Sequence, residues 1–273
     1  MTEKVALVTG ASSGIGESAA RQLHELGYTV YGAARRVEKM KDLANAGVHV
    51  LAMDVTDATS MADGVRRIID DHGRIDVLVN NAGYGSYGAV EDVPLEEARY
   101  QFEVNVFGAA QLIQLVAPHM RAQGSGRIIN ITSMGGKIYT PFGGWYHGTK
   151  FALEALSDSL RNELRPFGVD VVVIEPGAIR TEWGGIAMEN LRKTSGAGAY
   201  AKPVERMSRQ FERGAGSRLS SDPKVIGNAI VRAATTRRPR TRYALGVGAK
   251  PGIFLRWLLP DRAFDGLLRL GLG

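Results

Sequence analysis

The 273-residue sequence contains no cysteine and no long apolar run. The missing cysteine excludes disulfides, thiolate nucleophiles and thiolate metal sites, and it suits a reducing compartment. No apolar run approaches the roughly 20 residues that span a bilayer. The N-terminus lacks the basic and then apolar pattern of a signal peptide. The five histidines are scattered without the spacing of metal ligands: His24, His49, His72, His119 and His147. We therefore expect a soluble, cytoplasmic protein without a metal site.

Charge is distributed unevenly along the chain. Residues 1–191 hold 17 basic and 23 acidic side chains, a net charge of −6, whereas residues 192–273 hold 17 and 5, a net charge of +12. A basic run over residues 237–242 lies in this second part. Such a run could contact nucleic acid or an anionic membrane, but it carries no nucleic-acid-binding motif. We interpret it as a solvated face and expect no nucleic-acid partner, although a nucleic-acid-binding protein stays a rival hypothesis.

Short runs rich in Val and Ile alternate with helical patterns. Strands are predicted over residues 4–9, 29–33, 48–52, 77–79, 127–132 and 169–175. Runs that are apolar on both faces are typical of a parallel sheet covered by helices. Helices are predicted over residues 55–71 and within 94–123. This order predicts an α/β fold: a doubly wound, Rossmann-type parallel sheet with helices on both faces, in a single domain spanning residues 1–273.

The pattern is weaker after the sixth strand. Residues 184–216 are rich in Gly, Ala, Ser and charge, with only weak helical signals. Long segments of this kind are often lids, so we predict a substrate lid over residues 184–221. A helix over 225–235 and a strand near 243–247 follow. An apolar C-terminal extension over 248–273 is expected to be helical.

A glycine-rich turn follows the first strand, in the sequence TGASSGIG over residues 9–16. Glycines allow backbone N–H groups to approach a pyrophosphate, and the next helix offers its positive N-terminal end. Six residues of this turn are predicted to bind a dinucleotide: Gly10, Ser12, Ser13, Gly14, Ile15 and Gly16. The same letters contain G-x-S-x-G, the nucleophile elbow of α/β-hydrolases. That elbow lies well inside the sheet and needs an acid and a histidine in order, so we set the hydrolase reading aside.

The end of the second strand decides between the two nicotinamide cofactors. An acidic residue here would bind the ribose 2′-OH of NAD. This sequence instead has Ala34, Arg35 and Arg36. Arg35 could pair with a 2′-phosphate through a bidentate, charge-assisted hydrogen bond, and Arg36 either helps or faces solvent. The sequence therefore predicts NADP(H) over NAD(H).

Tyr146 and Lys150 are four residues apart and share one face of a predicted helix. An unperturbed phenol has a pKa near 10, too high for efficient proton transfer at neutral pH, and a nearby ammonium should lower that pKa. Ser133, at the end of the fifth strand, is placed to hydrogen-bond a substrate oxygen. By helical geometry we expect His147 to face away from the site.

These motifs occur together in the order and spacing of the short-chain dehydrogenase/reductase family, which the chain resembles over about residues 4–181. The glycine pattern G-x-x-x-G-x-G, the NNAG motif at 80–83, Asn105, Ser133 and the Tyr146/Lys150 pair carry the resemblance. It implies that Tyr146 donates a proton while hydride passes to a carbonyl carbon. It also implies that Lys150 binds the nicotinamide ribose, and that Asn105 holds a water next to Lys150.

The resemblance implies further cofactor contacts. Asp54 and Val55 correspond to the pair beside the adenine. Asn80, Asn81, Ala82 and Gly83 lie beside the adenine ribose and steady the sheet. Pro176, Gly177, Ile179 and Thr181 belong to the turn that binds the carboxamide. The family's two long helices usually form a dimer interface, so a homodimer or tetramer is implied.

The long tail is similar to the 17β-hydroxysteroid and retinol dehydrogenase-like branch. With Phe254, Trp257 and Phe264 it indicates a lipophilic carbonyl or alcohol as substrate, of steroid, retinoid or fatty type. The tail could equally pack on the core or a partner subunit, or rest with the basic run on an anionic membrane surface. Two alternatives stay open: a small polar carbonyl reductase, and a non-catalytic NADPH-binding regulator. The intact Ser133, Tyr146 and Lys150 argue against the regulator.

Overall fold

The computed structural model describes residues 3–215 and 220–272. They contain one seven-stranded sheet in which every pair of neighbouring strands is parallel. The strands are β1 (Val5–Thr9), β2 (Thr29–Ala34), β3 (His49–Ala52), β4 (Val77–Asn80), β5 (Gly126–Ile131), β6 (Val169–Pro176) and β7 (Arg242–Leu245). Their spatial order is β3-β2-β1-β4-β5-β6-β7. The predicted doubly wound sheet is confirmed, with all seven strands near their predicted positions.

The strand order reverses between β1 and β4. In open parallel sheets the ligand crevice lies at such a reversal, outside the carboxyl ends of the strands. Thr9 ends β1 and Asn80 ends β4. The glycine-rich turn and the NNAG motif therefore meet where the topology places a dinucleotide.

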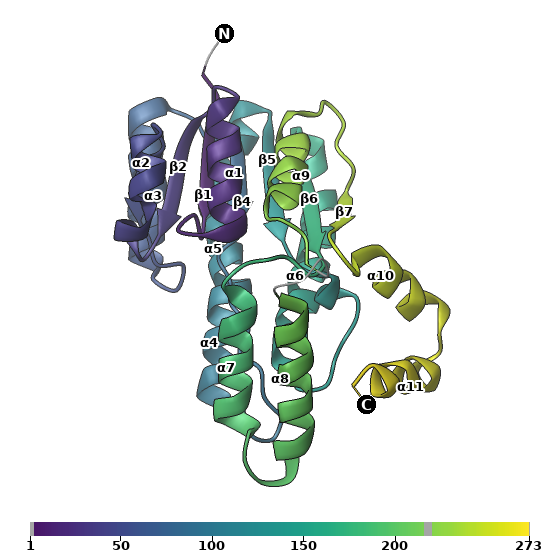
Figure 1. Cartoon of the computed structure of the whole chain (residues 1–273). Coiled ribbons are helices and arrows are strands. Elements are labelled where there is room, and N and C mark those ends of the chain that lie inside the picture. Colours follow the sequence, from purple (N-terminus) through teal and green to yellow (C-terminus); the bar gives the residue numbers. More distant parts are fainter. Residues whose placement is uncertain (1–2, 216–219, 273) are drawn as a thin grey trace.

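Helices cover both faces of the sheet (Figure 1). One face carries α1 (Gly14–Glu25), α2 (Lys41–Asn45) and α9 (Lys224–Thr235), which share one apolar core. The other carries α3 (Ala58–His72), α5 (Gly108–Gln123) and α6 (Gly144–Leu164), which share a second. The helix predicted over 55–71 begins at Ala58, because Asp57 caps it: its carboxylate accepts hydrogen bonds from the backbone N–H groups of Thr59 and Ser60, at 2.8 and 3.2 Å.

The long helix predicted within 94–123 is interrupted by a wider turn. It comprises α4 (Leu95–Phe102), the π-helical turn η2 (Glu103–Phe107) and α5. π turns are frequent at functional sites, because the inserted residue changes the direction of nearby side chains. Asn105, a predicted site residue, lies in this turn.

The segment predicted as a loose lid is instead helical. Residues 183–215 form α7 (Trp183–Ser195), the 3-10 turn η5 (Gly198–Tyr200) and α8 (Ala201–Ala215), which descend side by side below the sheet (Figure 1). Met188 and Leu191 of α7 pack with Val204 of α8 in a third apolar cluster. The two helices stabilise each other through this contact, so each needs little helical propensity of its own. Residues 216–219 of the predicted lid lie outside the described residues.

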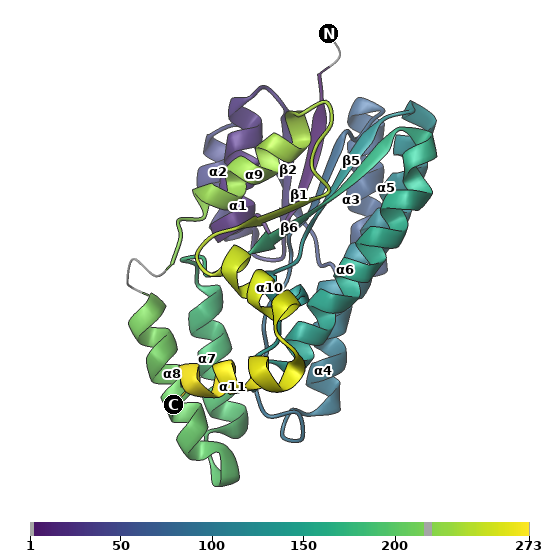
Figure 2. The same cartoon turned by 90° about the vertical axis from the view of Figure 1, so that its right-hand side faces the viewer.

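The C-terminal extension is helical, as expected. It forms α10 (Ala249–Leu258) and α11 (Asp261–Leu272), and Figure 2 shows α11 turning toward α7 and α8. Phe264 is buried with its ring centroid 5.4 Å from that of Tyr139, and the Tyr139 hydroxyl donates to Asp265 Oδ1 at 2.8 Å. These contacts attach the extension to the loop that follows β5.

Candidate active site

The glycine-rich turn between β1 and α1 is built so that only glycine fits at three positions. Gly10 and Gly14 have φ angles of 64° and 61°, in the left-handed region. At Gly16, a side-chain carbon would lie 2.3 Å from the Gly10 carbonyl oxygen. Helix α1 can therefore approach β1 closely, and its first N–H groups point across the turn as an anion site requires.

Ser12, Ser13 and Ile15 complete this turn. Ser13 is the N-cap residue of α1 in extended conformation, and its side chain makes no capping hydrogen bond. Its hydroxyl and the first N–H groups of α1 are therefore available to a phosphate. Ser12 and Ile15 are partly buried beside it.

The residues of the NNAG motif contact both the sheet and the glycine-rich turn. Asn80 turns its amide into the interior, where Nδ2 donates to Asn130 Oδ1 at 2.9 Å, and so braces β4 against β5. Asn81 Nδ2 donates to the Thr9 carbonyl at 2.9 Å, and the Ala82 N–H donates to Thr9 Oγ1 at 3.0 Å. A side-chain carbon at Gly83 would lie 3.0 Å from Asn105 Oδ1 and 3.6 Å from Lys150 Nζ. The motif thus connects the glycine-rich turn to the Tyr146/Lys150 region.

The residues at the ends of β2 and β3 lie at the opposite end of the crevice. Arg35 and Arg36 are exposed, and Arg35 Nη1 donates to the Tyr100 hydroxyl of α4 at 2.9 Å. The Asp54 side chain contacts its own loop, where Oδ1 accepts a hydrogen bond from the Thr56 N–H at 2.9 Å. The carbonyl of Val55 packs against Gly108, where a side-chain carbon would lie 2.3 Å away. Arg35 is therefore oriented across a surface that a 2′-phosphate could reach.

Four predicted residues converge at the carboxyl ends of β4 and β5. Lys150 Nζ lies 5.9 Å from the centroid of the Tyr146 ring and donates to the Ile131 carbonyl at 3.1 Å. Ser133 Oγ accepts a hydrogen bond from the Gly135 N–H at 3.0 Å. Asn105 Nδ2 donates to Thr149 Oγ1 at 3.0 Å. The site therefore brings a phenol, a hydroxyl, an amine and an amide together on rigid elements.

Burial sets the protonation of the two titrating groups. Tyr146 is 7% exposed, and burial raises the pKa of its phenol to about 12, against a smaller opposite effect of the Ser133 hydrogen bond. Burial also lowers the pKa of Lys150 to about 8, which the charge of Glu154 opposes. The sequence predicts a lowered pKa for Tyr146, but desolvation by burial raises it. The Tyr146 phenol is therefore protonated at neutral pH.

His147 lies against Tyr146, which the sequence did not predict. Its ring centroid is 5.6 Å from that of Tyr146. Its nitrogens face the loop after β5: Nε2 accepts from the Thr140 N–H at 3.0 Å, so Nδ1 carries the proton and donates to the Gly135 carbonyl at 2.9 Å. Burial lowers the pKa of His147. A neutral His147 thus fixes the loop behind the phenol.

An aromatic cluster that sequence reasoning missed surrounds Tyr146. The rings of Tyr87 and Trp183 have their centroids 5.7 and 5.0 Å from that of Tyr146. The apolar side chains of α7 and α8 continue this cluster. Tyr87 and Trp183 come from segments almost 100 residues apart. One signal could have indicated them: each lies a few residues after a cofactor motif, NNAG or the turn after β6.

An open cavity of about 430 Å³ lies at the outer end of this cluster. Ala89, Val90, Glu91, Phe142 and Tyr200 line it. Phe142 has a φ angle of 62°, a strained conformation for a residue with a side chain. The Gly88 N–H donates to its carbonyl at 2.8 Å and so holds this conformation. The cavity walls are thus mostly apolar, with a single carboxylate.

The turn after β6 is fixed against the glycine-rich turn. Pro176 ends β6, and a side-chain carbon at Gly177 would lie 2.2 Å from the Val247 carbonyl oxygen. Ile179 bridges to Ser221, while Thr181 Cγ2 lies 3.0 Å from the position of a side-chain carbon at Gly14. The turn therefore closes one side of the dinucleotide crevice.

Within residues 3–215 and 220–272, no group of three or more His, Asp or Glu side chains could hold a metal ion. None of the helices there is both long and apolar enough to cross a membrane.

The fold and site place the chain in a class of nicotinamide-dependent oxidoreductases, and the comparison with family models agrees. The model described as short chain dehydrogenase matches residues 4–191. The chain therefore belongs to the short-chain dehydrogenase/reductase family.

Relatives of similar length support this assignment. The chain is 36% identical to a probable short-chain type dehydrogenase/reductase, VdlC, of Helicobacter pylori, over 97% of each chain. It is 36% identical to the 3-ketodihydrosphingosine reductase of Bacteroides thetaiotaomicron, over 90% of this chain and 89% of that one. It is 34% identical to the NADPH-dependent 3-dehydrocapnine reductase of Ornithobacterium rhinotracheale, over 96% and 95%.

Solved structures share the whole fold. A short-chain dehydrogenase from Streptomyces avermitilis matches with a TM-score of 0.81 and 36% identity, over 98% of this chain and 96% of that one. A metagenomic short-chain oxidoreductase in complex with NADP matches with a TM-score of 0.70 and 29% identity, over 89% and 96%. A Burkholderia phymatum enzyme in complex with NAD, 23% identical with a TM-score of 0.78 over 96% and 94%, shares the fold.

Proposed function

We propose that the protein is an NADP(H)-dependent reductase of lipophilic ketones, with Tyr146 as the general acid. The observation that carries the proposal is the convergence of Ser133, Tyr146 and Lys150 beside a glycine-rich turn. The bound cofactor supplies the hydride that the carbonyl carbon accepts. Ser133 hydrogen-bonds the carbonyl oxygen, and Tyr146 donates to that oxygen the proton that completes the alcohol. Oxidation is the reverse, with Tyr146 accepting the proton.

The residues present fit a dinucleotide. The glycine cradle at Gly10, Gly14 and Gly16 would be filled by any side chain, and the N–H groups at the start of α1 suit a pyrophosphate. Asp54, Val55 and the NNAG motif would line the adenine ribose. Lys150 would bind the nicotinamide ribose, while Ile179 and Thr181 would bind the carboxamide.

Arg35 supports NADP(H) as the cofactor. It directly follows Ala34, which stands where an acidic residue would bind the ribose of NAD, and its contact with Tyr100 holds it near the end of β2. We expect Arg35→Ala to raise the KM for NADPH by about 10- to 100-fold and leave the KM for NADH unchanged, as the loss of a charge-assisted bidentate contact implies. Arg99→Ala is the control, because Arg99 is an exposed arginine of α4 paired with Glu96. An unchanged cofactor preference in Arg35→Ala would refute this assignment.

The cluster around Tyr146 supports a lipophilic substrate. Tyr87 and Trp183 flank the phenol, and Met188 and Leu191 extend the apolar surface toward α8. Two relatives at 36% and 34% identity are named as reductases of 3-ketodihydrosphingosine and 3-dehydrocapnine. We therefore propose a ketone on a long chain rather than a steroid or a small polar carbonyl.

A direct assay tests the function. Purified protein and NADPH are incubated with a series of ketones of increasing chain length, and with small polar carbonyls, while the absorbance of NADPH is followed. We expect kcat/KM to rise with chain length, because each buried CH₂ contributes about 0.8 kcal/mol. A preference for small polar carbonyls would overturn the lipophilic assignment. NADPH binding without turnover on any carbonyl would favour the regulator.

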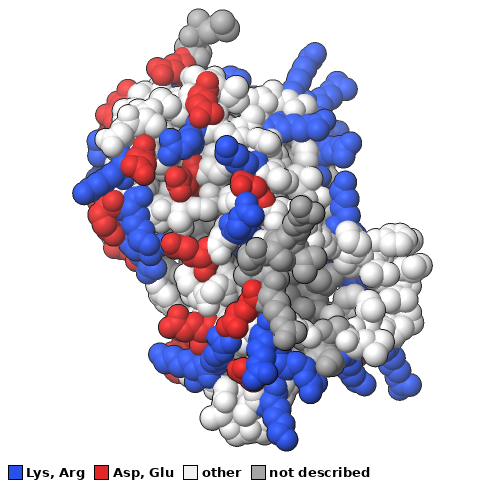
Figure 3. Space-filling model, in the orientation of Figure 1, with Lys and Arg blue, Asp and Glu red and all other residues white. Residues whose placement is uncertain are grey.

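The exposed face of α10 supports an additional contact with an anionic lipid surface, which we propose as the occupant of that face. Trp257 is 78% exposed and shares its helix face with Phe254, Leu258 and Lys250. Asp261 of α11 pairs with Arg256, and Asp265 accepts from Tyr139, while Arg262 and Arg269 are exposed. Figure 3 shows this protruding region as mostly uncharged, with Lys and Arg below it. Apolar side chains flanked by cations suit the interface of an anionic bilayer.

Vesicle flotation tests this contact. We expect the wild-type protein to float with vesicles that contain phosphatidylglycerol, and to stay at the bottom of the gradient with vesicles of pure phosphatidylcholine. The Trp257→Ser variant should stay at the bottom with both kinds of vesicle. Ile186→Ser is the control, because Ile186 is an exposed apolar residue of α7. Protein that stays behind with anionic vesicles would overturn the proposal. So would a Trp257-dependent dimer, which would show that a second copy covers the face.

A further inference from the structure

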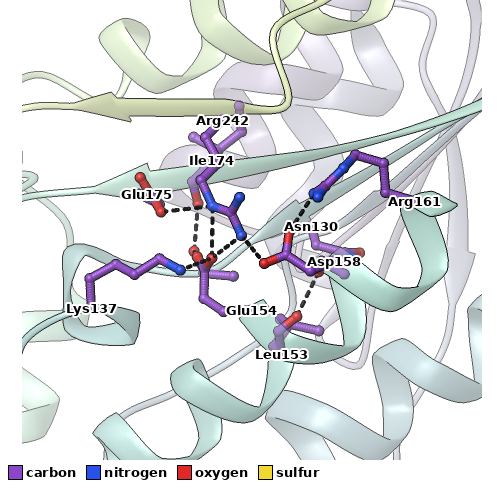
Figure 4. A network of polar contacts seen from close by, with 11 residues as sticks. Asn130, Lys137, Leu153, Glu154, Asp158, Arg161, Ile174, Glu175 and Arg242 are labelled. Carbon is purple, nitrogen blue, oxygen red and sulfur yellow. Dashed lines mark hydrogen bonds and ion pairs between the residues drawn. The ribbon is translucent and has the colours of Figure 1, made fainter.

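A network of carboxylates and cations centres on Glu154 and Arg242 (Figure 4). Glu154 of α6 is 3% exposed, and its Oε2 lies 3.0 Å from both Lys137 Nζ and Arg242 Nη2. Arg242, at the start of β7, also donates to Asp158 Oδ2 at 2.6 Å. Its Nε lies 3.3 Å from Glu175 Oε1. Asp158 further pairs with Arg161. The network therefore joins α6, β6, β7 and the loop after β5.

Glu154 contacts the site through the fifth strand. Its Oε1 accepts a hydrogen bond from the Thr132 hydroxyl at 2.6 Å. The same hydroxyl lies 3.0 Å from the Ile174 carbonyl, but it has one proton, and the charged carboxylate is the stronger acceptor. Thr132 directly precedes Ser133. The carboxylate of Glu154 therefore fixes the backbone from which Ser133 reaches the substrate oxygen.

Glu154 also acts on Lys150, one helical turn before it. Residues four apart lie on the same helix face. Lys150 is buried, which penalises its charged form, and the charge of Glu154 raises the pKa of Lys150 against that penalty. Of the other charged groups of the network, Lys137 and Arg242 contact Glu154 itself. Asp158 and Glu175 contact Arg242, and Arg161 pairs with Asp158.

Glu175 is the member of the network that takes up a proton. Burial raises the pKa of Glu175 to about 7, with the charge of Glu154 as the second cause. Its Oε1 makes no hydrogen bond within the described part of the chain, although it lies within ion-pair distance of Arg242. Glu154, by contrast, contacts two cations through one oxygen, Lys137 and Arg242.

We propose that Glu154 is a positioning residue of the reductase: it fixes the Ser133 backbone through Thr132 and keeps the Lys150 amine charged. The proposal rests on the proposed function, since it concerns the same site. Removal of this one charge should change the pH dependence of turnover, whereas a merely structural role would change stability alone.

The test compares the pH profiles of two matched variants. Glu154→Gln and Asp158→Asn each replace a carboxylate partner of Arg242 by an amide, but only Glu154 is one turn from Lys150. In Glu154→Gln we expect the alkaline limb of kcat near pH 8 to move about one unit lower, as the loss of a nearby opposite charge implies. At pH 8, about a tenth of the amine stays charged in the variant and about half in the wild type. The activity at pH 8, expressed as a fraction of each protein's own plateau, is therefore about fivefold lower in the variant. Asp158→Asn should keep the wild-type limb.

A third variant separates the two roles of Glu154. Thr132→Val removes the hydrogen bond to Glu154 and keeps the charge, so we expect kcat to fall about tenfold or more while the alkaline limb stays in place. An unmoved limb in Glu154→Gln, or the same shift in Asp158→Asn, would overturn the effect on Lys150. A wild-type kcat in Thr132→Val would overturn the effect on Ser133. If Glu154→Gln does not fold, the kcat of Thr132→Val alone decides whether the proposal stands. A wild-type protein without NADPH-linked turnover would instead refute the proposed function.

Discussion

At the residue scale, burial shifts the pKa values of two site residues, Tyr146 and Lys150, in opposite directions. Burial raises the pKa of Tyr146 to about 12 and keeps the phenol protonated, and burial lowers the pKa of Lys150 to about 8. Tyr87 and Trp183 exclude water from the phenol. A protonated phenol is the form that the proposed ketone reduction requires.

A pH dependence follows from these values. The proposed mechanism requires the Tyr146 proton, which is present below about pH 12, and the Lys150 charge, which is lost as the pH rises through about 8. We expect kcat/KM for ketone reduction to fall by about tenfold per pH unit above 8, as the loss of one required proton implies. Steady-state rates between pH 6 and 10 measure this fall. A rate of reduction that increases from pH 7 to 9 would contradict the assignment.

The proposed catalytic residues could be named from the sequence because they are close along the chain or belong to motifs. Tyr146 and Lys150 are one helical turn apart, and Ser133 follows the fifth strand. The direction of the Tyr146 pKa could not be predicted, because its cause lies elsewhere. Tyr87 and Trp183 reach the phenol from distant segments, and only the fold brings them together.

At the element scale, the packing of α1 against β1 determines whether the glycine-rich turn can bind a phosphate. We expect Gly16→Ala to raise the dissociation constant for NADPH by more than about tenfold, because a 1.4 kcal/mol loss already gives a factor of ten. The added carbon would lie 2.3 Å from the Gly10 carbonyl oxygen and 2.5 Å from Asn81 Nδ2, so the helix must move. Quenching of protein fluorescence by NADPH measures the affinity.

Gly185→Ala is the matched control for this substitution. Gly185 lies in α7 and has open space around the position of a side-chain carbon. Alanine there should keep the affinity for NADPH and stabilise α7 by up to about 1 kcal/mol, since glycine is a poor helix former. Equal affinities in the two variants would show that close packing at Gly16 does not shape the cofactor site.

The helices α7 and α8 show where sequence patterns give too little information. Gly184, Gly185 and many charged residues weaken the helical signal of residues 184–216. In the structure, Gly184 permits Phe211 to approach, since a side-chain carbon would lie 2.3 Å from its ring. Gly184, which reduces helical propensity, is thus part of the contact that stabilises the helix pair. By contrast, β1, β2, β4 and β6 were predictable, because they are short and mostly apolar runs that are buried on both faces.

At the scale of the whole molecule, the outer surface of α5 and α6 is a candidate for self-association. Phe107, Phe151 and Leu156 are large apolar side chains exposed on this side of the sheet. A homodimer or tetramer would bury them, as the family resemblance implies. We expect light scattering to give the mass of a dimer or tetramer, and Phe151→Glu to give a smaller species, because an unpaired charge in an interface is strongly unfavourable.

Val225→Glu provides the control for this prediction. Val225 is exposed on α9, which covers the opposite face of the sheet. The same charge there should leave the mass unchanged. A wild-type protein that is monomeric at micromolar concentration would contradict the predicted interface, as would an equal effect of both substitutions.

The most direct test of the account is turnover by Tyr146→Phe, with Tyr28→Phe as a control at the far end of the sheet. The variant keeps the aromatic packing with Trp183 and loses only the proton donor. We predict that it binds NADPH as the wild type does, while kcat for ketone reduction falls by about 10²- to 10⁴-fold, the usual contribution of a general acid. Turnover near the wild-type rate would contradict the account.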